Sequence, residues 1–247
     1  DASDVYLSQL YFQDIPSFLD EAARQGDEGA LEGTVIISEN QTASRGRQGR
    51  GWVSNEGNLY LSVLFRPSMK ILPMLNILGG IGAVRAIRAC TGSHPQIKWP
   101  NDVMLGGKKV SGLLVESVVQ GQEVIYAVLG IGINIDLDIE SLGDIRNSTT
   151  SLNIAAGRTV DRETLLSHLL HDLDGLYQQV TQGVPVLPEW RSILNTLGCP
   201  VEAWNGNAHY TGVPYDVDEV GNLLLRMNDG KTITLTAGDV SLSKVAP

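Results

Sequence analysis

Apolar and polar residues alternate with a period of two in several segments, and this pattern predicts β-strands. In residues 58–65 (NLYLSVLF), one face of such a strand would carry Leu59, Leu61, Val63 and Phe65. Residues 33–38 (GTVIIS) form an apolar run that is typical of a buried strand. Two longer runs, 109–119 and 123–135, are separated by a short QGQ segment, which indicates a β-hairpin.

Other segments place apolar residues at helical spacing, three and four positions apart. The helices expected are 17–25, 74–90, 161–180 and 188–197. Asp161 stands where an N-cap belongs, before a run of leucines that recur on one helical face. Glycines weaken a helix interior, so Gly79, Gly80 and Gly82 in the second helix predict close packing of a neighbouring element there.

The pattern changes after Gly198, where short β-like runs are separated by turn signals such as Asn205-Gly206 and Gly221-Asn222. This spacing is typical of a small antiparallel barrel. We therefore expect two domains, residues 1–197 and 198–247. The polar stretch 141–152 is expected to be a loop.

Composition indicates a globular protein, because 43% of the 247 residues are hydrophobic and 19% are charged. The 18 basic and 28 acidic residues give a formal net charge of −10, which argues against a general nucleic-acid binder. No apolar run is long enough to span a membrane, and the N-terminus has no signal-peptide pattern. Two widely separated cysteines, Cys90 and Cys199, suggest a reducing, cytoplasmic location, although a disulfide between them stays open.

Positive charge is nevertheless concentrated in residues 42–54 (TASRGRQGRGWVS), here called the Arg/Gly loop. Glycine lets backbone N–H groups approach a ligand, and arginine presents a planar fork that matches carboxylate or phosphate. The loop therefore predicts a site for a small anion, with a solvated basic loop as the alternative. It matches neither the Walker pattern nor a dinucleotide-binding fingerprint.

Three further clusters strengthen the prediction of a site: KWPNDVM (98–104), KKVSGLLVE (108–116) and GIGIN (130–134). Pro100 restricts the backbone around Trp99, so Lys98 and Asp102 can be held rigidly. Glycines inside strands, as at Gly112, often mark the close approach of a ligand.

The Arg/Gly loop, KWPND, KKVSG-LLVE and GIGIN, in this order, resemble the biotin–protein ligases, and GDVSL (238–242) resembles the end of that family's small barrel. The resemblance implies an α+β fold, with a mixed β-sheet flanked by helices as in class II synthetases and a C-terminal SH3-like β-barrel. It also implies an ATP-dependent ligase that forms biotinyl-5′-AMP and then biotinylates one lysine of a biotin carboxyl carrier protein. Mg²⁺ is expected to accompany ATP, without a protein metal site.

The resemblance also implies roles for individual residues. The biotin-binding set is Ser17, Gln41, Arg45, Gly46, Arg47, Trp52, Lys98, Gly112 and Gly132. The ATP-binding set is Arg47, Arg50, Lys109 and Asn134, with residues 147–153 covering adenine. The catalytic set is Arg47, Lys98, Lys109 and Asp102, of which Asp102 is the candidate base for the acceptor lysine.

The chain departs from the family pattern at three positions. Phe18 and Leu19 stand where Thr and Asn are expected, and Ser44 stands where Gly is usual. We therefore expect weaker biotin binding and a stiffer loop than in a typical member. The family's N-terminal DNA-binding domain has no counterpart here, so no repressor function is expected. A homodimer stays open.

Three alternatives remain at this stage. A lipoate–protein ligase would share the adenylation chemistry, but the pairing of SRGRQGRGW with KWPND favours biotin. A single-strand nucleic-acid binder could use the arginines and the small barrel. An inactive biotin-binding scaffold would follow if Phe18 and Leu19 disable the site.

Overall fold

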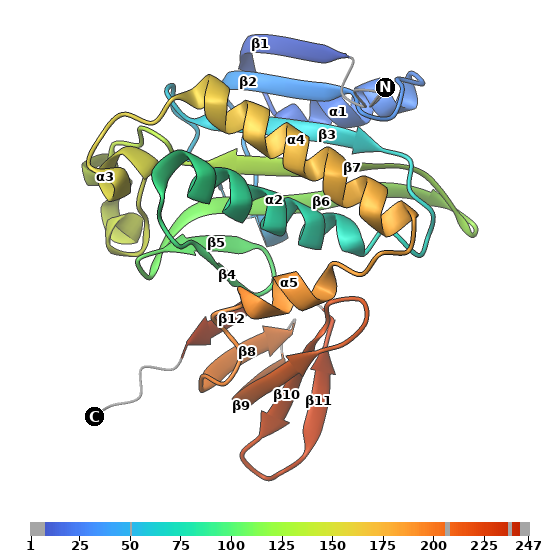
Figure 1. Cartoon of the computed structure of the whole chain (residues 1–247), viewed down its shortest axis with the longest axis vertical. Coiled ribbons are helices and arrows are strands. Elements are labelled where there is room, and N and C mark those ends of the chain that lie inside the picture. The colour runs from blue at the N-terminus through green and yellow to red at the C-terminus, as the bar shows by residue number, and fades with distance from the viewer. Residues whose placement is uncertain (1–7, 50, 206–207, 237–238, 243–247) are drawn as a thin grey trace.

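The computed structural model describes residues 8–49, 51–205, 208–236 and 239–242 of the chain. It contains a large sheet flanked by helices and, beyond one edge of it, a smaller sheet built by the C-terminal residues (Figure 1). The predicted α+β fold is thereby confirmed. Within the described residues, no helix is long and apolar enough to cross a membrane.

The large sheet has the strand order β1-β2-β3-β7-β6-β5-β4. Its strands are β1 (Gln9–Ile15), β2 (Val35–Gln41), β3 (Leu59–Phe65), β4 (Gln96–Lys98), β5 (Asp102–Leu105), β6 (Lys108–Gln120) and β7 (Glu123–Ile133). β1 and β2 run parallel, whereas the other neighbouring strands run antiparallel. The predicted hairpin is β6–β7, in which Gly112 lies opposite Gly132.

Helices cover both faces of this sheet. The helices are α1 (Phe18–Asp27), α2 (Met74–Thr91), α3 (Leu152–Ala156), α4 (Arg162–Thr181) and α5 (Leu187–Ser192), with short 3₁₀ segments η1 (Arg47–Gly49) and η2 (Ile139–Ser148). In β3 the predicted alternation is real: Leu61 and Phe65 join the core beneath α2 and α4, whereas Tyr60 and Leu64 pack with α1 on the other face. Every side chain of β3 is therefore buried.

The glycines of α2 explain how closely that helix approaches its neighbours. A Cβ added at Gly79 would lie 2.5 Å from Leu113 Cδ2, and one at Gly80 would lie 2.8 Å from Ile97 Cδ1. Both distances are shorter than van der Waals contact, so the close packing predicted at these glycines is confirmed. The Asp161 N-cap of α4 is confirmed as well, because Asp161 Oδ2 accepts a hydrogen bond from Thr164 N at 2.8 Å.

The small sheet has the order β11-β10-β9-β8-β12. Its strands are β8 (Val201–Asn205), β9 (Ala208–Val217), β10 (Leu223–Met227), β11 (Thr232–Leu235) and β12 (Asp239–Leu242). Its neighbouring strands pair antiparallel, consistent with an SH3-like unit. Trp99 Nε1 donates to Gly221 O at 2.9 Å, which ties the two sheets together. The division at 197/198 remains our proposal.

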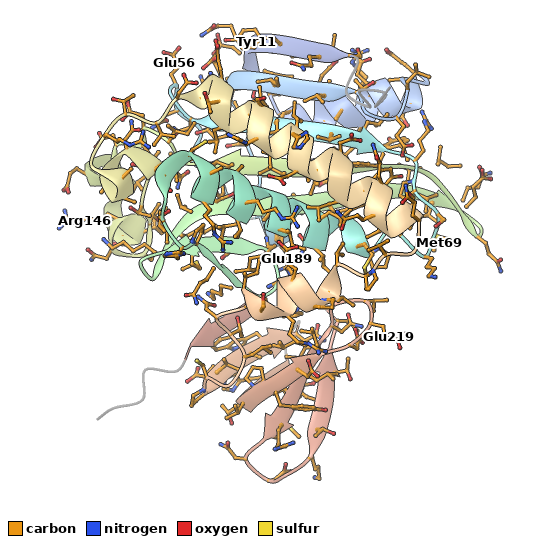
Figure 2. All side chains as sticks on the ribbon, in the orientation of Figure 1. Tyr11, Glu56, Met69, Arg146, Glu189 and Glu219 are labelled. Carbon is orange, nitrogen blue, oxygen red and sulfur yellow. The ribbon has the colours of Figure 1, made fainter. Side chains whose placement is uncertain are left out.

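Two segments differ from the sequence prediction. β1 was not expected, because its outer side chains are polar and exposed; Tyr11 is 59% exposed at the edge of the molecule (Figure 2). The polar stretch 141–152 is not a plain loop, since η2 occupies much of it and α3 begins at Leu152, a fully buried residue. One buried leucine is enough to anchor a short helix but too little to give a periodic signal.

Candidate active site

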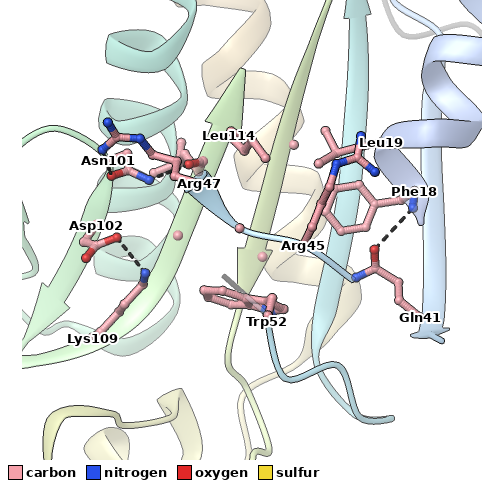
Figure 3. Close-up of a pocket in the computed structure, with 16 residues that line it drawn as sticks. Phe18, Leu19, Gln41, Arg45, Arg47, Trp52, Asn101, Asp102, Lys109 and Leu114 are labelled. Carbon is pink, nitrogen blue, oxygen red and sulfur yellow. Dashed lines mark hydrogen bonds and ion pairs between the residues drawn. The ribbon is translucent and has the colours of Figure 1, made fainter. Parts of the chain in front are cut away.

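A first pocket opens between the Arg/Gly loop, the start of α1 and strands β5, β6 and β7 (Figure 3). Its lining consists of Phe18, Leu19, Gln41, Arg45, Gly46, Arg47, Gly51, Trp52, Asn101, Asp102, Lys109, Gly112, Leu113, Leu114, Gly130 and Gly132. Segments between residues 18 and 132 that are far apart in sequence thus meet in one cavity.

Two cations lie at one end of this pocket. Lys109 Nζ lies 2.7 Å from Asp102 Oδ1 and 5.1 Å from the centre of the Trp52 ring. Arg47 Nη1 donates to Asn101 Oδ1 at 3.1 Å, and Asn101 Nδ2 donates in turn to Leu113 O at 2.6 Å. The Asn101 side chain, itself held by Leu113 O, therefore orients Arg47, while Asp102 holds Lys109. This end of the pocket is suited to a carboxylate or a phosphate.

The opposite end of the pocket combines apolar side chains from the start of α1 with the Arg45 side chain (Figure 3). Phe18 and Leu19 begin α1 and are only 7% and 2% exposed. Their side chains face Gly130 of β7, where a Cβ would lie 2.8 Å from Phe18 Cε2 and 2.6 Å from Leu19 Cδ2. Gln41 lies beside them, and its Oε1 accepts a hydrogen bond from Phe18 N at 3.2 Å (Figure 3).

Several contacts hold the Arg/Gly loop against the pocket. Ser44 Oγ donates to Trp52 O, and Arg45 forms an antiparallel backbone bridge with Gly51, so the two ends of the loop are joined. The Arg45 side chain pairs with Asp20 of α1 and with Glu116 of β6, the latter at 2.7 Å. Hydrogen bonds to Glu116 raise the pKa of the Arg45 guanidinium, so this side chain stays protonated and positively charged.

Trp52 forms a wall between the first pocket and a second one. A Cβ at Gly112 would lie 2.8 Å from Trp52 Cζ3, and one at Gly132 would lie 3.0 Å from Trp52 Cε2. The indole therefore lies flat on the two glycines that pair across β6 and β7. Trp52 Nε1 is buried and has no hydrogen-bond partner among the described residues.

The second pocket lies on the other side of Trp52 and is largely apolar. Its lining consists of Gly51, Trp52, Val53, Lys98, Asp102, Met104, Lys109, Asn134, Leu137, Leu142, Ile145, Ser148 and Thr149. Asn134 is 3% exposed, and its Nδ2 donates to Thr150 O at 3.1 Å. Because Trp52, Asp102 and Lys109 line both pockets, a molecule that filled both would pass directly over Lys109.

Known proteins share this sequence and fold. The model of the family described as "Biotin/lipoate A/B protein ligase family" matches residues 18–134. The bifunctional ligase/repressor BirA of Bacillus spizizenii is 32% identical over 235 residues, covering 92% of this chain and 72% of BirA. The biotin–[acetyl-CoA-carboxylase] ligase of Mycobacterium tuberculosis is 32% identical over 230 residues, covering 90% of this chain and 83% of that enzyme.

The chain belongs to the biotin–protein ligases. Among solved structures, the biotin protein ligase of Aquifex aeolicus in complex with biotin and ATP matches it with a TM-score of 0.81. That match covers 96% of this chain and 99% of the other at 27% identity. The family resemblance seen in the sequence motifs is therefore confirmed.

The structure of this ligase brings most of the predicted site residues together. Those that line the first pocket are Gln41, Arg45, Gly46, Arg47, Trp52, Asp102, Lys109, Gly112 and Gly132. Lys98, predicted to contact both biotin and the adenylate, lines the second pocket instead, beside Asn134. Residues Ser148 and Thr149 of the segment expected to cover adenine also lie there.

Three predicted residues need separate comment. Ser17 is buried behind the lining of the first pocket, where its Oγ accepts hydrogen bonds from Asp20 N and from Arg45 Nη1, both at 3.3 Å. Gly112 and Gly132 were expected to make room for biotin, but here they make room for the Trp52 indole.

Arg50 lies outside the described residues.

Sequence reasoning missed several lining residues of this ligase. Asn101 belongs to the KWPND motif, so the sequence could have marked it as a site residue. Its bond to Arg47, however, depends on a loop that is remote in sequence. Leu114 and Gly130 come from strands whose register no sequence pattern specified. In the second pocket, Leu142 and Ile145 are apolar residues inside a polar stretch, and this contrast was the signal that could have found them.

Proposed function

We propose that this ligase joins biotin to ATP, forming biotinyl-5′-AMP and pyrophosphate, and then transfers the biotinyl group to one lysine of a biotin carboxyl carrier protein. The observation that carries the proposal is a pair of cations: Arg47 lines the first pocket, and Lys109 lines both pockets. Adenylation must bring a carboxylate against the α-phosphate of ATP, and two anions approach each other only where positive charge offsets their repulsion.

The two pockets suggest where each substrate would bind. The first pocket would hold the biotin rings and chain between Phe18, Leu19 and Trp52, with the carboxylate toward Arg47. The second pocket would hold adenosine against Val53, Leu142 and Ile145. The reacting atoms would then lie beside Trp52, which lines both pockets. Arg45 would act by fastening the Arg/Gly loop to Asp20 and Glu116, which keeps water from the mixed anhydride.

Lys109 is proposed to leave Asp102 and stabilise the charge that develops on the α-phosphate. Lys98 would reach the adenylate from the second pocket, and Arg50 would order the loop or reach pyrophosphate. Mg²⁺ is expected to arrive with ATP, held mainly by phosphate oxygens. Within the described residues, no group of three or more His, Cys, Asp or Glu side chains is suited to a metal ion. We propose that Asn134 lies near the nucleotide and its Mg²⁺, with its Oδ1 facing them.

Asp102 is proposed to remove a proton from the acceptor lysine in the second step. A free lysine has a pKa of about 10.4, so little of the reactive neutral amine exists near neutral pH. Once Lys109 engages phosphate, the Asp102 carboxylate could accept the proton as the amine attacks the acyl carbon and AMP leaves. Asp102 lines both pockets, next to the position proposed for the anhydride.

The acceptor, the location and the assembly of the protein belong to the same proposal. A cytoplasmic enzyme is consistent with Cys90 and Cys199, which are both free thiols. The small sheet is proposed to help position the carrier protein that delivers its lysine to the site. Two copies of the ligase are proposed to pair side by side along their sheets, which measurement of the mass in solution would test.

A transfer assay tests the proposal. The ligase is incubated with labelled biotin, Mg²⁺–ATP and a biotin carboxyl carrier domain, and label on the domain is counted. A carrier whose acceptor lysine is replaced by arginine is the matched control. We expect ATP-dependent label on the first carrier alone. Equal labelling of both carriers, or none of either, would contradict the proposed transfer.

A further inference from the structure

Asn101 is fixed to strand β6 through both its backbone and its side chain. Leu113 N donates a hydrogen bond to Asn101 O at 3.0 Å, and Asn101 Nδ2 donates to Leu113 O at 2.6 Å. The preceding carbonyl is held as well, because Asn76 Nδ2 of α2 donates to Pro100 O at 2.7 Å. Strand β6 and helix α2 thus hold the half-buried Asn101 in one position.

These bonds also decide which atom of the Asn101 amide faces Arg47. Arg47 Nη1 donates to Asn101 Oδ1 at 3.1 Å, while Asn101 Nδ2 donates to Leu113 O. The reversed amide would place two acceptor oxygens against each other at Leu113 and two donor nitrogens against each other at Arg47. Only the observed orientation satisfies both neighbours, so Asn101 presents a fixed acceptor to the Arg47 guanidinium.

A fixed acceptor matters because the Arg47 guanidinium has space in more than one direction. Arg47 and Asn101 both line the first pocket, and both also line a third pocket beside Pro100 and Thr236. An arginine side chain has several rotatable bonds, and holding it in one conformation opposes its conformational entropy. Arg47 can offset the charge of a carboxylate in the first pocket only while its guanidinium stays at that pocket.

We propose that Asn101 is a positioning residue for adenylation, which acts on the reaction by holding the Arg47 guanidinium at the first pocket. The inference rests on the proposed function, in which Arg47 offsets the repulsion between the carboxylate and the α-phosphate. Asn101 itself accepts no proton and forms no covalent bond with a substrate. Its effect comes from placement, because a displacement of about 1 Å at a reacting centre is enough to slow a reaction strongly.

A double-mutant cycle in the full chain tests this role. The wild type, Asn101→Ala, Arg47→Ala and the double variant are each incubated with biotin, Mg²⁺ and α-labelled ATP, and kcat/KM for labelled biotinyl-AMP is measured. We expect Asn101→Ala to lower kcat/KM by about tenfold in the wild-type background. In the Arg47→Ala background the same change should lower it by less than about twofold, because the group that Asn101 positions is already absent.

Asn222→Ala is the matched control for the loss of a half-buried amide. Asn222 Nδ2 donates to Asp218 Oδ2 at 2.8 Å, but Asn222 lines neither the first, the second nor the third pocket. Its kcat/KM should stay within about twofold of the wild type. If Asn101→Ala does not fold, Asn101→Ser, which also lacks the amide, takes its place in the cycle.

Asn101→Asp tests the same role with a side chain of the same shape. A carboxylate cannot donate to Leu113 O, and it would pair with Arg47 as an ion and so withdraw the guanidinium from the substrate. We expect kcat/KM for biotinyl-AMP formation to fall by about 100-fold, close to the value of Arg47→Ala. A rate equal to that of the wild type would overturn the inference.

The outcomes of the cycle separate this inference from the proposed function. Biotinyl-AMP from the wild type, with equal losses on Asn101→Ala in both backgrounds or with no loss in either, would overturn the inference alone. Equal losses would show that Asn101 acts independently of Arg47. No biotinyl-AMP from the wild type would overturn the proposed function and the inference with it.

Discussion

The indole of Trp52 lines both pockets and lies over Gly112 of β6 and Gly132 of β7. Strand interiors disfavour glycine, so these two positions need a reason. The reason in this structure is the space they leave for the ring, which no side chain at either position could share. The position of the Trp52 indole in turn determines where biotin and ATP would meet.

Gly112→Ala tests this dependence. Its Cβ would lie 2.8 Å from Trp52 Cζ3 and 3.1 Å from Lys109 Cε, so the indole or the lysine must move. We expect kcat/KM for adenylation to fall by about ten- to 100-fold, because a misplacement of about 1 Å at a reacting centre has an effect of this size. Tryptophan fluorescence should also change. Gly175→Ala is the control, since a Cβ there meets no atom within 4 Å. Wild-type kinetics in Gly112→Ala would contradict the packing argument.

Asp102→Asn separates the two half-reactions. Asparagine keeps the shape of the side chain but cannot accept a proton, so transfer from preformed biotinyl-AMP to the carrier should fall by about 100-fold or more. Adenylation should change less, because Lys109 is released from its 2.7 Å pair rather than removed. Single-turnover assays of each step measure both effects. Transfer at the wild-type rate would show that Asp102 is not the base.

The Arg/Gly loop is the element whose conformation the sequence could not specify. Its residues indicated an anion site, but its attachment depends on partners elsewhere in the chain. Arg45 reaches Asp20 and Glu116, and Arg47 reaches Asn101, at sequence separations of 25, 71 and 54 residues. Pairings of this kind follow from the tertiary fold, so no local pattern reports them.

Ser44→Gly tests whether the hydrogen bond between the two ends of the Arg/Gly loop holds the loop in place. The hydroxyl of Ser44 bonds to Trp52 O across the loop, and removing it costs about 1 kcal/mol for one hydrogen bond. We expect biotinyl-AMP to leave the site about fivefold faster, as measured by dilution of the preformed complex. Ser44→Ala, which removes the hydroxyl without adding backbone freedom, should reproduce most of this effect. Release at the wild-type rate in both variants would contradict the role of the bond.

Element prediction from the sequence succeeded where periodicity was strong and failed where it was weak. The hairpin β6–β7 and the helix α4 follow from apolar patterns that extend over many residues. β1 was missed because Leu10 and Phe12 are only half-buried and two exposed polar residues separate them from buried Ile15, so the alternation is broken. The order of strands, which places β6 between β7 and β5, is a matter of tertiary pairing that the sequence pattern does not contain.

The two sheets of the whole molecule share one buried core. Val201, Ala203 and Leu223 of the small sheet belong to the same cluster as Leu78 and Ile81 of α2. Trp99 adds a directional contact, because its Nε1 donates to Gly221 O at 2.9 Å while its backbone N donates to Thr196 Oγ1 at 3.0 Å. The segment that carries Asn101 and Asp102 is thereby fixed to the small sheet.

Trp99→Phe removes the side-chain bond and keeps most of the packing. We expect the free energy of unfolding to fall by about 1–3 kcal/mol, because Gly221 O loses its donor and the smaller ring leaves space. The melting temperature should fall by roughly 2–4 °C for each kcal/mol in a chain of this size. Trp204→Phe is the control, since Trp204 is 37% exposed. Equal melting temperatures for both variants would contradict the coupling.

Arg47 in the first pocket and Lys109, which lines both pockets, are proposed to offset the repulsion between a biotin carboxylate and the α-phosphate of ATP. The most direct test incubates the wild-type chain and Arg47→Ala with biotin, Mg²⁺ and α-labelled ATP, and measures labelled biotinyl-AMP. We predict biotin-dependent product from the wild type and at least about a 100-fold lower rate from the variant, as for loss of one preorganised group in such a site. Absence of product from the wild type, or equal rates from both proteins, would contradict the account.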